Sequence, residues 1–193
     1  MDERALIGAA CRGDVGSFNC LVCRHQDAAY NVAYRLLGHV DAAGDALEEA
    51  LLKAHRALPA LRGAPFEVWL LRRVVDACRR RARVSRRGSP VPLGTRVQGG
   101  SCFGSPGETS LDPDLVQTIE AGIGSLPFES RAVLVLADVQ GLSYEEIGQV
   151  TGLAPATGGR RLAEGRRRLR NWLYGGGPGT RRALRASAIC RET

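Results

Sequence analysis

Residues 141–170 read GLSYEEIGQVTGLAPATGGRRLAEGRRRLR and carry the clearest structural signal in this 193-residue chain. Ser143 and Glu146 have the spacing of a capping box, in which each side chain bonds a free backbone N–H at the start of a helix. Leu142 and Ile147 flank them at the two positions of a hydrophobic staple. These four residues predict that a helix begins directly after Ser143.

A glycine turn separates this short helix from a longer, basic one. The first helix is expected to end at Gly152, and the second to begin between residues 154 and 157 and run to Leu173. Helix, tight turn and basic helix form the helix-turn-helix arrangement, whose second helix enters the major groove of DNA. A plain helical hairpin with a solvated arginine face is the alternative. Gly158 and Gly159 each cost roughly 1 kcal/mol of helix stability relative to Ala, so the second helix either starts late or is ordered only on DNA.

The pattern of the remaining sequence is also helical. Aromatic residues make up 5% of the chain, β-branched residues are few, and no segment alternates with the period of a strand. Pro127 is expected to open a helix that runs to about Gln140 and ends at Gly141. Apolar residues at spacings of three and four predict three earlier helices. They are Phe18, Leu21, Val22, His25, Ala29, Val32 and Leu36 before Gly38; Ala43, Leu47, Ala50, Ala54 and Leu58; and Trp69, Leu70, Val74, Ala77 and Cys78 after Phe66.

Composition divides the chain into parts. From 88 to 110, 13 of 23 residues are Gly, Ser or Pro, which predicts a flexible linker. We therefore expect an all-α protein of two small helical domains joined by a flexible linker, the second domain being the helix-turn-helix. The expected parts are a first domain at 1–85, a linker at 86–111, a second domain at 112–174 and a basic tail at 175–193.

Positive charge gathers in two of these parts. The formal net charge is +7 at pH 7. Eight Arg accompany one Asp at 72–87, and six Arg accompany one Glu at 160–170, whereas residues 112–159 hold seven acids and one Arg. Solubility alone would be served by interspersed charges, so this distribution favours a nucleic-acid partner.

The sequence shows no secretory pattern, and no run approaches the roughly 18 apolar residues that cross a bilayer. We expect a cytoplasmic protein whose six cysteines are thiols. Cys20, Cys23 and His25 have a spacing that suggests zinc. At about 100° per residue, however, His25 lies about 140° from Cys20 and about 160° from Cys23 around one helix. The three cannot converge on one ion, so we expect no metal site.

Both parts of the chain resemble the extracytoplasmic-function sigma factors of bacteria. The second part resembles region four of that family, and the first resembles region two, so that the resemblance covers roughly residues 5–85 and 112–173. The region-four motifs are Leu126-Pro127, Arg131, Val133-Leu134-Val135-Leu136, Asp138, Gly141 to Ile147 and Arg166 to Arg170. The region-two motifs are Gly13-Asp14, Phe18, Tyr30, Arg35 to Gly38, Asp45, Glu49, Leu52 to Ala54, Arg56 to Leu58, Arg62-Gly63, Phe66 and Trp69-Leu70.

The resemblance implies a function and its sites. The chain would bind core RNA polymerase, through the clamp helices of the large subunit, and promoter DNA, with an anti-sigma factor as a further partner. It would be no enzyme, with no catalytic residue and no cofactor. Polymerase would contact Asp45, Glu48, Glu49 and Leu52. The loop from Pro59 to Pro65 and the helix from Phe66 would recognise and open the minus 10 element. The DNA contacts there would be Arg62, Arg72, Arg79, Arg80 and Arg83, of which the last four are candidates for phosphate contacts. The minus 35 element would be contacted by Thr157, Arg160, Arg161 and Arg166. Trp69 is expected in the core rather than as a stacking platform for bases.

The sequence also departs from the family pattern. The family commonly has Gln where Glu48 stands, an aromatic residue where His55 stands, and Asp and Glu where Ala42 and Gly44 stand. Docking on polymerase is therefore expected to be altered. The alternative function is a helix-turn-helix regulator that has lost polymerase docking. An enzyme has little support, since the three histidines have no evident nucleophile partner and no phosphate-binding glycine loop precedes a helix.

Overall fold

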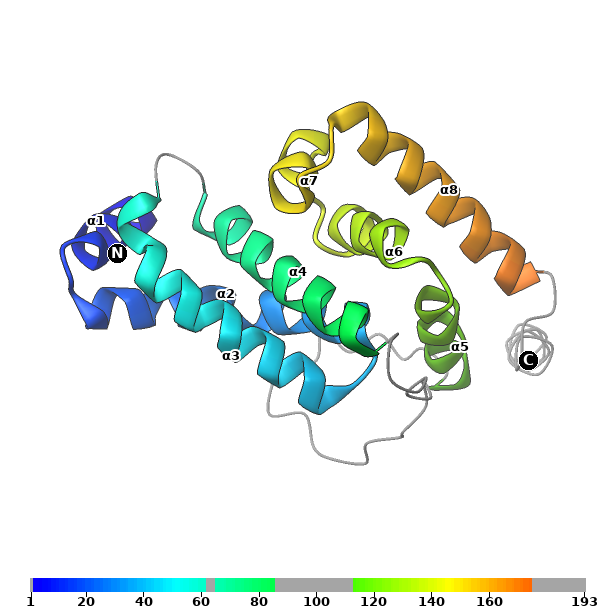
Figure 1. Cartoon of the computed structure of the whole chain (residues 1–193), viewed down its shortest axis with the longest axis horizontal. Coiled ribbons are helices and arrows are strands. Elements are labelled where there is room, and N and C mark those ends of the chain that lie inside the picture. The colour runs from blue at the N-terminus through cyan, green and yellow to red at the C-terminus, as the bar shows by residue number, and fades with distance from the viewer. Residues whose placement is uncertain (1, 62–64, 86–112, 175–193) are drawn as a thin grey trace, which may run out of the picture.

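The computed structural model describes residues 2–61, 65–85 and 113–174. Every regular element in these ranges is helical, which confirms the all-α prediction (Figure 1). The elements of the first half are α1 (Glu3–Cys11), α2 (Val15–Leu37), α3 (Val40–Ala57), the short η1 (Leu58–Ala60) and α4 (Phe66–Ser85). Those of the second half are α5 (Pro113–Gly124), α6 (Phe128–Leu134), the π-turn η2 (Val135–Val139), α7 (Tyr144–Thr151) and α8 (Pro155–Tyr174).

In the first half, α2, α3 and α4 pack pairwise against one another, and α1 covers one end of α2 (Figure 1). Asp14 caps α2 by accepting hydrogen bonds from the backbone N–H groups of Gly16 and Ser17. Gly38 ends α2 with a left-handed φ of 71°, which a residue without Cβ adopts at no steric cost. The three predicted apolar faces form the core, although Val22, His25 and Trp69 are only partly buried.

In the second half, α8 packs along α6 and contacts α5 and α7. The predicted capping box is present. Ser143 N–H donates to Glu146 Oε2 at 2.9 Å, and Glu146 N–H donates to Ser143 Oγ at 3.3 Å. The staple residue Ile147 is buried, and Gly152 ends α7 with φ 75°. The helix-turn-helix therefore has the predicted boundaries.

Other elements differ from the sequence expectations. Pro127 is the residue before α6 rather than its first residue, and the helix changes to a π-turn at Val135, with Gln140 N–H bonded to the Val135 carbonyl. Two helices, α1 and α5, were not predicted. The whole of the expected linker, at 86–111, and the basic tail, at 175–193, lie outside the described residues.

The two halves lie against each other. α4 packs on α7 and α6, and α2 contacts α5, α6 and η2 (Figure 1). Buried residues of both halves belong to one apolar cluster. Both α6 and α7 contact α4 on one side and α8 on the other. Within the described ranges, none of the helices has the length and apolar character required to span a bilayer.

Candidate polymerase and nucleic-acid interfaces

The outer face of α3 carries the predicted docking residues. Asp45 and Glu48 are exposed, and the Leu52 side chain is 55% exposed although it is apolar. Spacings of three and four residues place Asp45, Glu48 and Leu52 along one face of the helix. The structure therefore presents two carboxylates beside an unburied leucine.

Glu49 differs from its neighbours because it bonds cations of its own chain. Lys53 Nζ and Arg80 Nη2 both donate to Glu49 Oε1 at 2.6 Å, and Arg81 Nη1 donates to Oε2 at 2.7 Å. The hydrogen bond from Lys53, with that from Arg80, lowers the pKa of Glu49 from 4.5 to about 2. Arg81 also lies 3.8 Å from Asp45. Glu49 thus ties α3 to α4.

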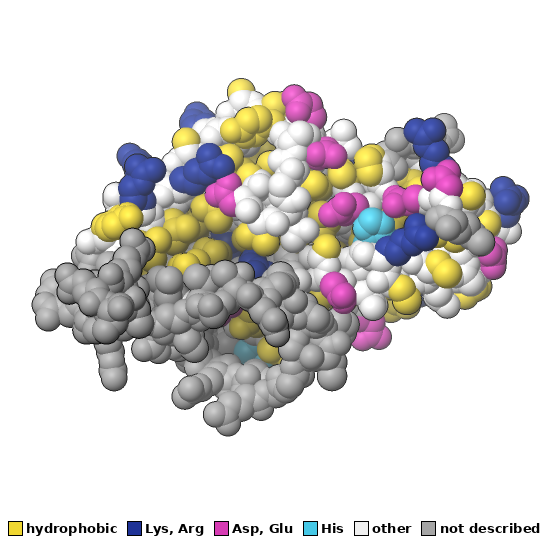
Figure 2. All heavy atoms as spheres, turned by 180° about the vertical axis from the view of Figure 1, so that it is seen from behind, with side chains coloured by type: hydrophobic (Ala, Val, Ile, Leu, Met, Phe, Trp, Pro, Cys, Tyr) yellow, Lys and Arg dark blue, Asp and Glu magenta, His cyan; other side chains and the backbone are white. Residues whose placement is uncertain are grey.

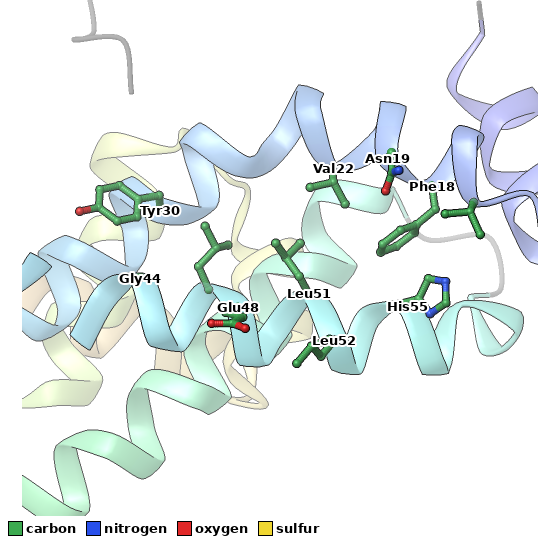
Figure 3. A pocket seen from close by; sticks show the side chains of 11 residues that line it. Phe18, Asn19, Val22, Tyr30, Gly44, Glu48, Leu51, Leu52 and His55 are labelled. Carbon is green, nitrogen blue, oxygen red and sulfur yellow. The ribbon is translucent and has the colours of Figure 1, made fainter. Parts of the chain in front are cut away.

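An apolar groove of about 480 Å³ lies between α2 and α3, beside these carboxylates. Figure 3 shows Val22 of α2 and Leu51 of α3 pointing towards each other and Phe18 pointing towards His55, while Glu48 and Leu52 lie at the edge of the groove. The His55 ring meets the Phe18 ring edge-on, with centroids 4.9 Å apart. The imidazole therefore packs against an aromatic ring at one end of the groove.

The α4 arginines separate into two groups. Arg72 and Arg83 are exposed. Arg80 bonds Glu49 of α3, and Arg79 bonds Glu129 of α6 and the Thr151 carbonyl. Of the five cations predicted to contact DNA near the minus 10 element, two are thus bonded within the protein, and Arg62 lies outside the described residues.

Trp69 is only half-buried, although it packs against the core as expected. Its ring lies 5.7 Å from that of Phe66, and the Arg73 guanidinium covers it at 3.4 Å from the ring centroid. Arg73 Nη1 also donates to the Trp69 carbonyl at 2.8 Å. The indole is therefore shielded by a cation, and a base could stack on that face only after Arg73 moved.

The recognition helix α8 begins at Pro155, so Gly158 and Gly159 lie inside it. Its inward side is marked by Gly158, Leu162 and Gly165, which are all buried. A Cβ at Gly165 would lie 3.3 Å from the Ser130 carbonyl oxygen, so the missing side chain allows α8 to approach α6 closely. The helix is thus continuous from Pro155 to Tyr174 and does not start late.

Arginines on α8 point in different directions. At about 100° per residue, Arg160 and Arg167 lie opposite the buried side, and both are exposed. Arg161 and Thr157 lie on one flank, half-buried. Arg166 lies on the other flank, where its Nε donates to Asp138 Oδ2 at 3.2 Å.

Arg167 was not among the predicted contacts. Its spacing from Arg160, seven residues or two helical turns, was the available signal. The structure thus brings Arg160 and Arg167 together on the outer face and places the predicted Thr157, Arg161 and Arg166 at its sides.

The cysteines and histidine considered for zinc lie apart. Cys20 and Cys23 are exposed, whereas the Nε2 atom of His25 is buried. This Nε2 lies 3.4 Å from Glu3 Oε2, and the centroid of the His25 ring lies 5.5 Å from that of the Phe66 ring. No cluster of three metal-binding side chains occurs among the residues the structure describes. The four described cysteines are free thiols.

Figure 2 shows acidic, basic and apolar side chains interspersed on the visible face, with no single charged patch there.

Comparisons with known proteins agree with this architecture. Residues 21–88 match the model of Sigma-70 region 2, and residues 117–169 match that of Sigma-70, region 4. The ECF RNA polymerase sigma factor SigE of Mycolicibacterium smegmatis is 35% identical over 161 residues, covering 81% of this chain. This chain spans 62% of the length of that relative. The ECF RNA polymerase sigma-E factor of Escherichia coli K12 is 28% identical over 180 residues, covering 89% of this chain and 94% of that protein.

Solved structures share the fold. CnrH in complex with the cytosolic domain of CnrY aligns with a TM-score of 0.68 and 23% identity, covering 91% of this chain and 99% of that one. The sigma factor RpoE in complex with the anti-sigma factor NepR, from Bartonella quintana, aligns with a TM-score of 0.64 and 22% identity, covering 82% and 98%. With the two region models matched in order on one chain, and with relatives of the same type along most of its length, this chain belongs to the sigma-70 family, among the extracytoplasmic-function sigma factors.

Proposed function

We propose that this chain binds core RNA polymerase and directs promoter-specific initiation of transcription, acting in the cytoplasm and catalysing no reaction itself. The observation that carries the proposal is the presence, on one chain, of an exposed acidic and apolar docking face on α3 and an outward arginine face on a helix-turn-helix. A regulator that only bound DNA would have no use for the first of these surfaces.

The docking site is the rim and floor of the groove between α2 and α3. Asp45 and Glu48 orient a basic helix of the polymerase, because complementary charges set the rate and register of association. Leu52 and the apolar floor supply the contact area. Glu49 acts indirectly, since its bonds to Arg80 and Arg81 hold α3 against α4. The groove is also a suitable site for an apolar helix of an anti-sigma factor.

Two helices contact DNA. Arg160 and Arg167 lie on the outer face of α8, which enters the major groove at the minus 35 element, with Thr157, Arg161 and Arg166 at its edges. Arg72 and Arg83 of α4 hold the backbone near the minus 10 element, because exposed guanidinium groups bind phosphate without regard to sequence. Arg79 and Arg80 join them only after leaving their protein partners.

Charge reversal on the docking face tests this function. The double variant Asp45→Lys and Glu48→Lys should lose co-elution with core polymerase and promoter-directed transcription, while its helical circular dichroism is retained because both residues are exposed. The matched control is Asp2→Lys together with Asp27→Lys, which makes the same charge change at exposed positions that do not line the groove.

Two results would contradict the proposal. If the docking variant co-elutes as the parent does, the α3 face is not the docking site. If the parent itself binds DNA but supports no transcription with core polymerase, the independent DNA-binding regulator becomes the better account.

A further inference from the structure

An exposed pair of cysteines lies on the outer face of α2, apart from the docking groove and from the DNA-binding arginines. Cys20 and Cys23 are both exposed free thiols. They lie three residues apart within α2, so about 60° around the helix and about 4.5 Å along its axis separate them. The two thiols therefore share one face of the helix and are open to solvent together.

This face points away from the groove between α2 and α3. Phe18 and Val22 are residues of α2 that line the groove (Figure 3). At about 100° per residue, Cys20 lies about 160° around the helix from each of them. Neither Cys20 nor Cys23 lines the groove. A ligand held by the two thiols would therefore leave the proposed docking site uncovered.

The other two cysteines that the structure describes are unsuited to hold a ligand. Cys78 is fully buried, and this burial raises the pKa of its thiol to about 12, so it stays protonated at neutral pH. Cys11 is half-buried, and its Sγ donates to the Leu58 carbonyl oxygen at 3.4 Å. Among the four described cysteines, only Cys20 and Cys23 are exposed.

The spacing of the pair fits a bridging atom better than a direct disulfide. Side chains three residues apart on a helix have Cβ atoms about 5–6 Å apart. A disulfide requires about 3.5–4.5 Å between its Cβ atoms, so this bond would distort α2. Two metal–thiolate bonds of about 2.3 Å each, the length found for zinc, place two sulfurs about 4.6 Å apart when they lie in a line. An intact helix can therefore bring both sulfurs to one metal ion.

The number of ligands decides which metal fits. No group of three His, Cys, Asp or Glu side chains that could hold a metal ion occurs in the part of the chain that the structure describes. Zinc takes at least three protein ligands, so a pair of thiols is a poor zinc site. Thiolates are soft ligands that select soft cations, of which Cu(I) is one. Because Cu(I) is stable with two sulfurs in a line, the pair is a complete site for this ion.

The charges around the pair neither favour nor oppose a cation strongly. Each sulfur binds as a thiolate and releases its proton to solvent, so two thiolates and one Cu(I) carry one net negative charge. Arg24 is exposed one turn after Cys20 and offsets that charge, whereas Asp27, exposed one turn after Cys23, opposes it. Since these two flanking charges cancel, the affinity depends on the two sulfurs.

We propose that Cys20 and Cys23 form a two-coordinate site for Cu(I) on the outer face of α2. The ion bridges the two sulfurs across one turn of the helix. The site is independent of the function proposed above, because it shares no residue with the docking face or with the DNA-binding faces of α4 and α8.

Competition for Cu(I) in the full-length chain tests the site. Cys102→Ser and Cys190→Ser are made in every protein, so that neither residue supplies a ligand; this protein is the reference chain. Without oxygen, it is titrated into the coloured Cu(I) complex of bathocuproine disulfonate, whose loss of colour measures the Cu(I) transferred. The reference chain should take up one Cu(I). Cys20→Ser or Cys23→Ser should weaken binding at least about 100-fold, because the second of two linked ligands adds about 10²–10⁴ in affinity.

A displaced pair is the matched control. Cys23→Ser together with Asp27→Cys keeps two thiols at exposed positions on the same face of α2, but separates them by seven residues, or about 10.5 Å along the axis. Thiolates that far apart cannot share one ion, so this variant should bind Cu(I) as weakly as Cys20→Ser does. Helical circular dichroism equal to that of the reference chain shows that the loss is not unfolding.

X-ray absorption at the copper edge should show two sulfur neighbours in the reference chain. An affinity of the displaced pair or of either single variant equal to that of the reference chain would refute the site. A third sulfur neighbour on the copper would refute the two-coordinate geometry. None of these measurements uses polymerase or DNA, so their outcome is separate from that of the proposed function.

Discussion

At the scale of single residues, Glu49 shows how one carboxylate in an acidic row acquires a different role. Asp45, Glu48 and Glu49 are equivalent in the sequence, and only the fold shows that Glu49 receives hydrogen bonds from Lys53, Arg80 and Arg81. The chain thus uses one member of the row to fix α3 on α4 and leaves the other two exposed.

This bonding makes stability depend on acidity. The pKa of Glu49 is lowered to about 2 from 4.5, so its contribution to stability is complete above about pH 4.5 and disappears as the pH falls towards 2. Glu49→Gln should lower the free energy of unfolding at pH 7 by about 1 kcal/mol, and this difference from the parent should shrink to nothing by about pH 2. Urea denaturation across that range measures it.

The control is Glu48→Gln, which changes the same chemical group at an exposed position one residue away. Its free energy of unfolding should stay close to that of the parent throughout. A difference for Glu49→Gln that is constant with pH would show that the ion pairs are not its source.

At the scale of elements, the recognition helix contains two glycines for which packing gives no reason. A Cβ at Gly158 would meet nothing within 4 Å, and one at Gly159 would meet only Tyr144 at 3.9 Å. Gly158→Ala and Gly159→Ala should each raise the free energy of unfolding by about 0.5–1 kcal/mol, because Ala loses less backbone entropy in a helix. Thermal or urea unfolding measures the gain.

Gly148, in α7, is the matched comparison. A Cβ there would lie 3.0 Å from the backbone oxygen of Leu153, across the turn of the helix-turn-helix. Gly148→Ala should therefore gain less stability than either substitution in α8, although the helix propensity gained is the same. An equal gain at all three positions would show that the turn is not closely packed.

Local signals explain which elements the sequence could predict. The Ser143–Glu146 box and the terminal glycines act over a few residues, so α7 and α8 could be predicted with both ends. The helices α2, α3 and α4 could be located by their apolar faces, with the end of α2 at Gly38 and the start of α4 near Phe66. The short helices α1 and α5 have no comparable start signal. The role of Arg79 could not be predicted, because its partners Glu129 and Thr151 lie 50 and 72 residues away. In the sequence it is one arginine of a cluster.

At the scale of the whole molecule, the interface between the halves has a consequence for heat denaturation. Val75 of α4 and Val133 of α6 belong to one buried apolar cluster, so unfolding either half exposes apolar surface of the other. Such coupling makes two structural units melt as one. Differential scanning calorimetry of the free chain should show a single peak whose van't Hoff enthalpy equals the measured enthalpy.

Loosening the interface should remove this cooperativity. In Glu129→Gln the peak should broaden, and its van't Hoff enthalpy should fall below the measured enthalpy, because the halves then melt partly independently. Two separate peaks in the parent would contradict a shared core. Thermal unfolding would thus depend on the contact between the two halves. In a bacterium whose temperature rises, both halves of this factor would unfold together.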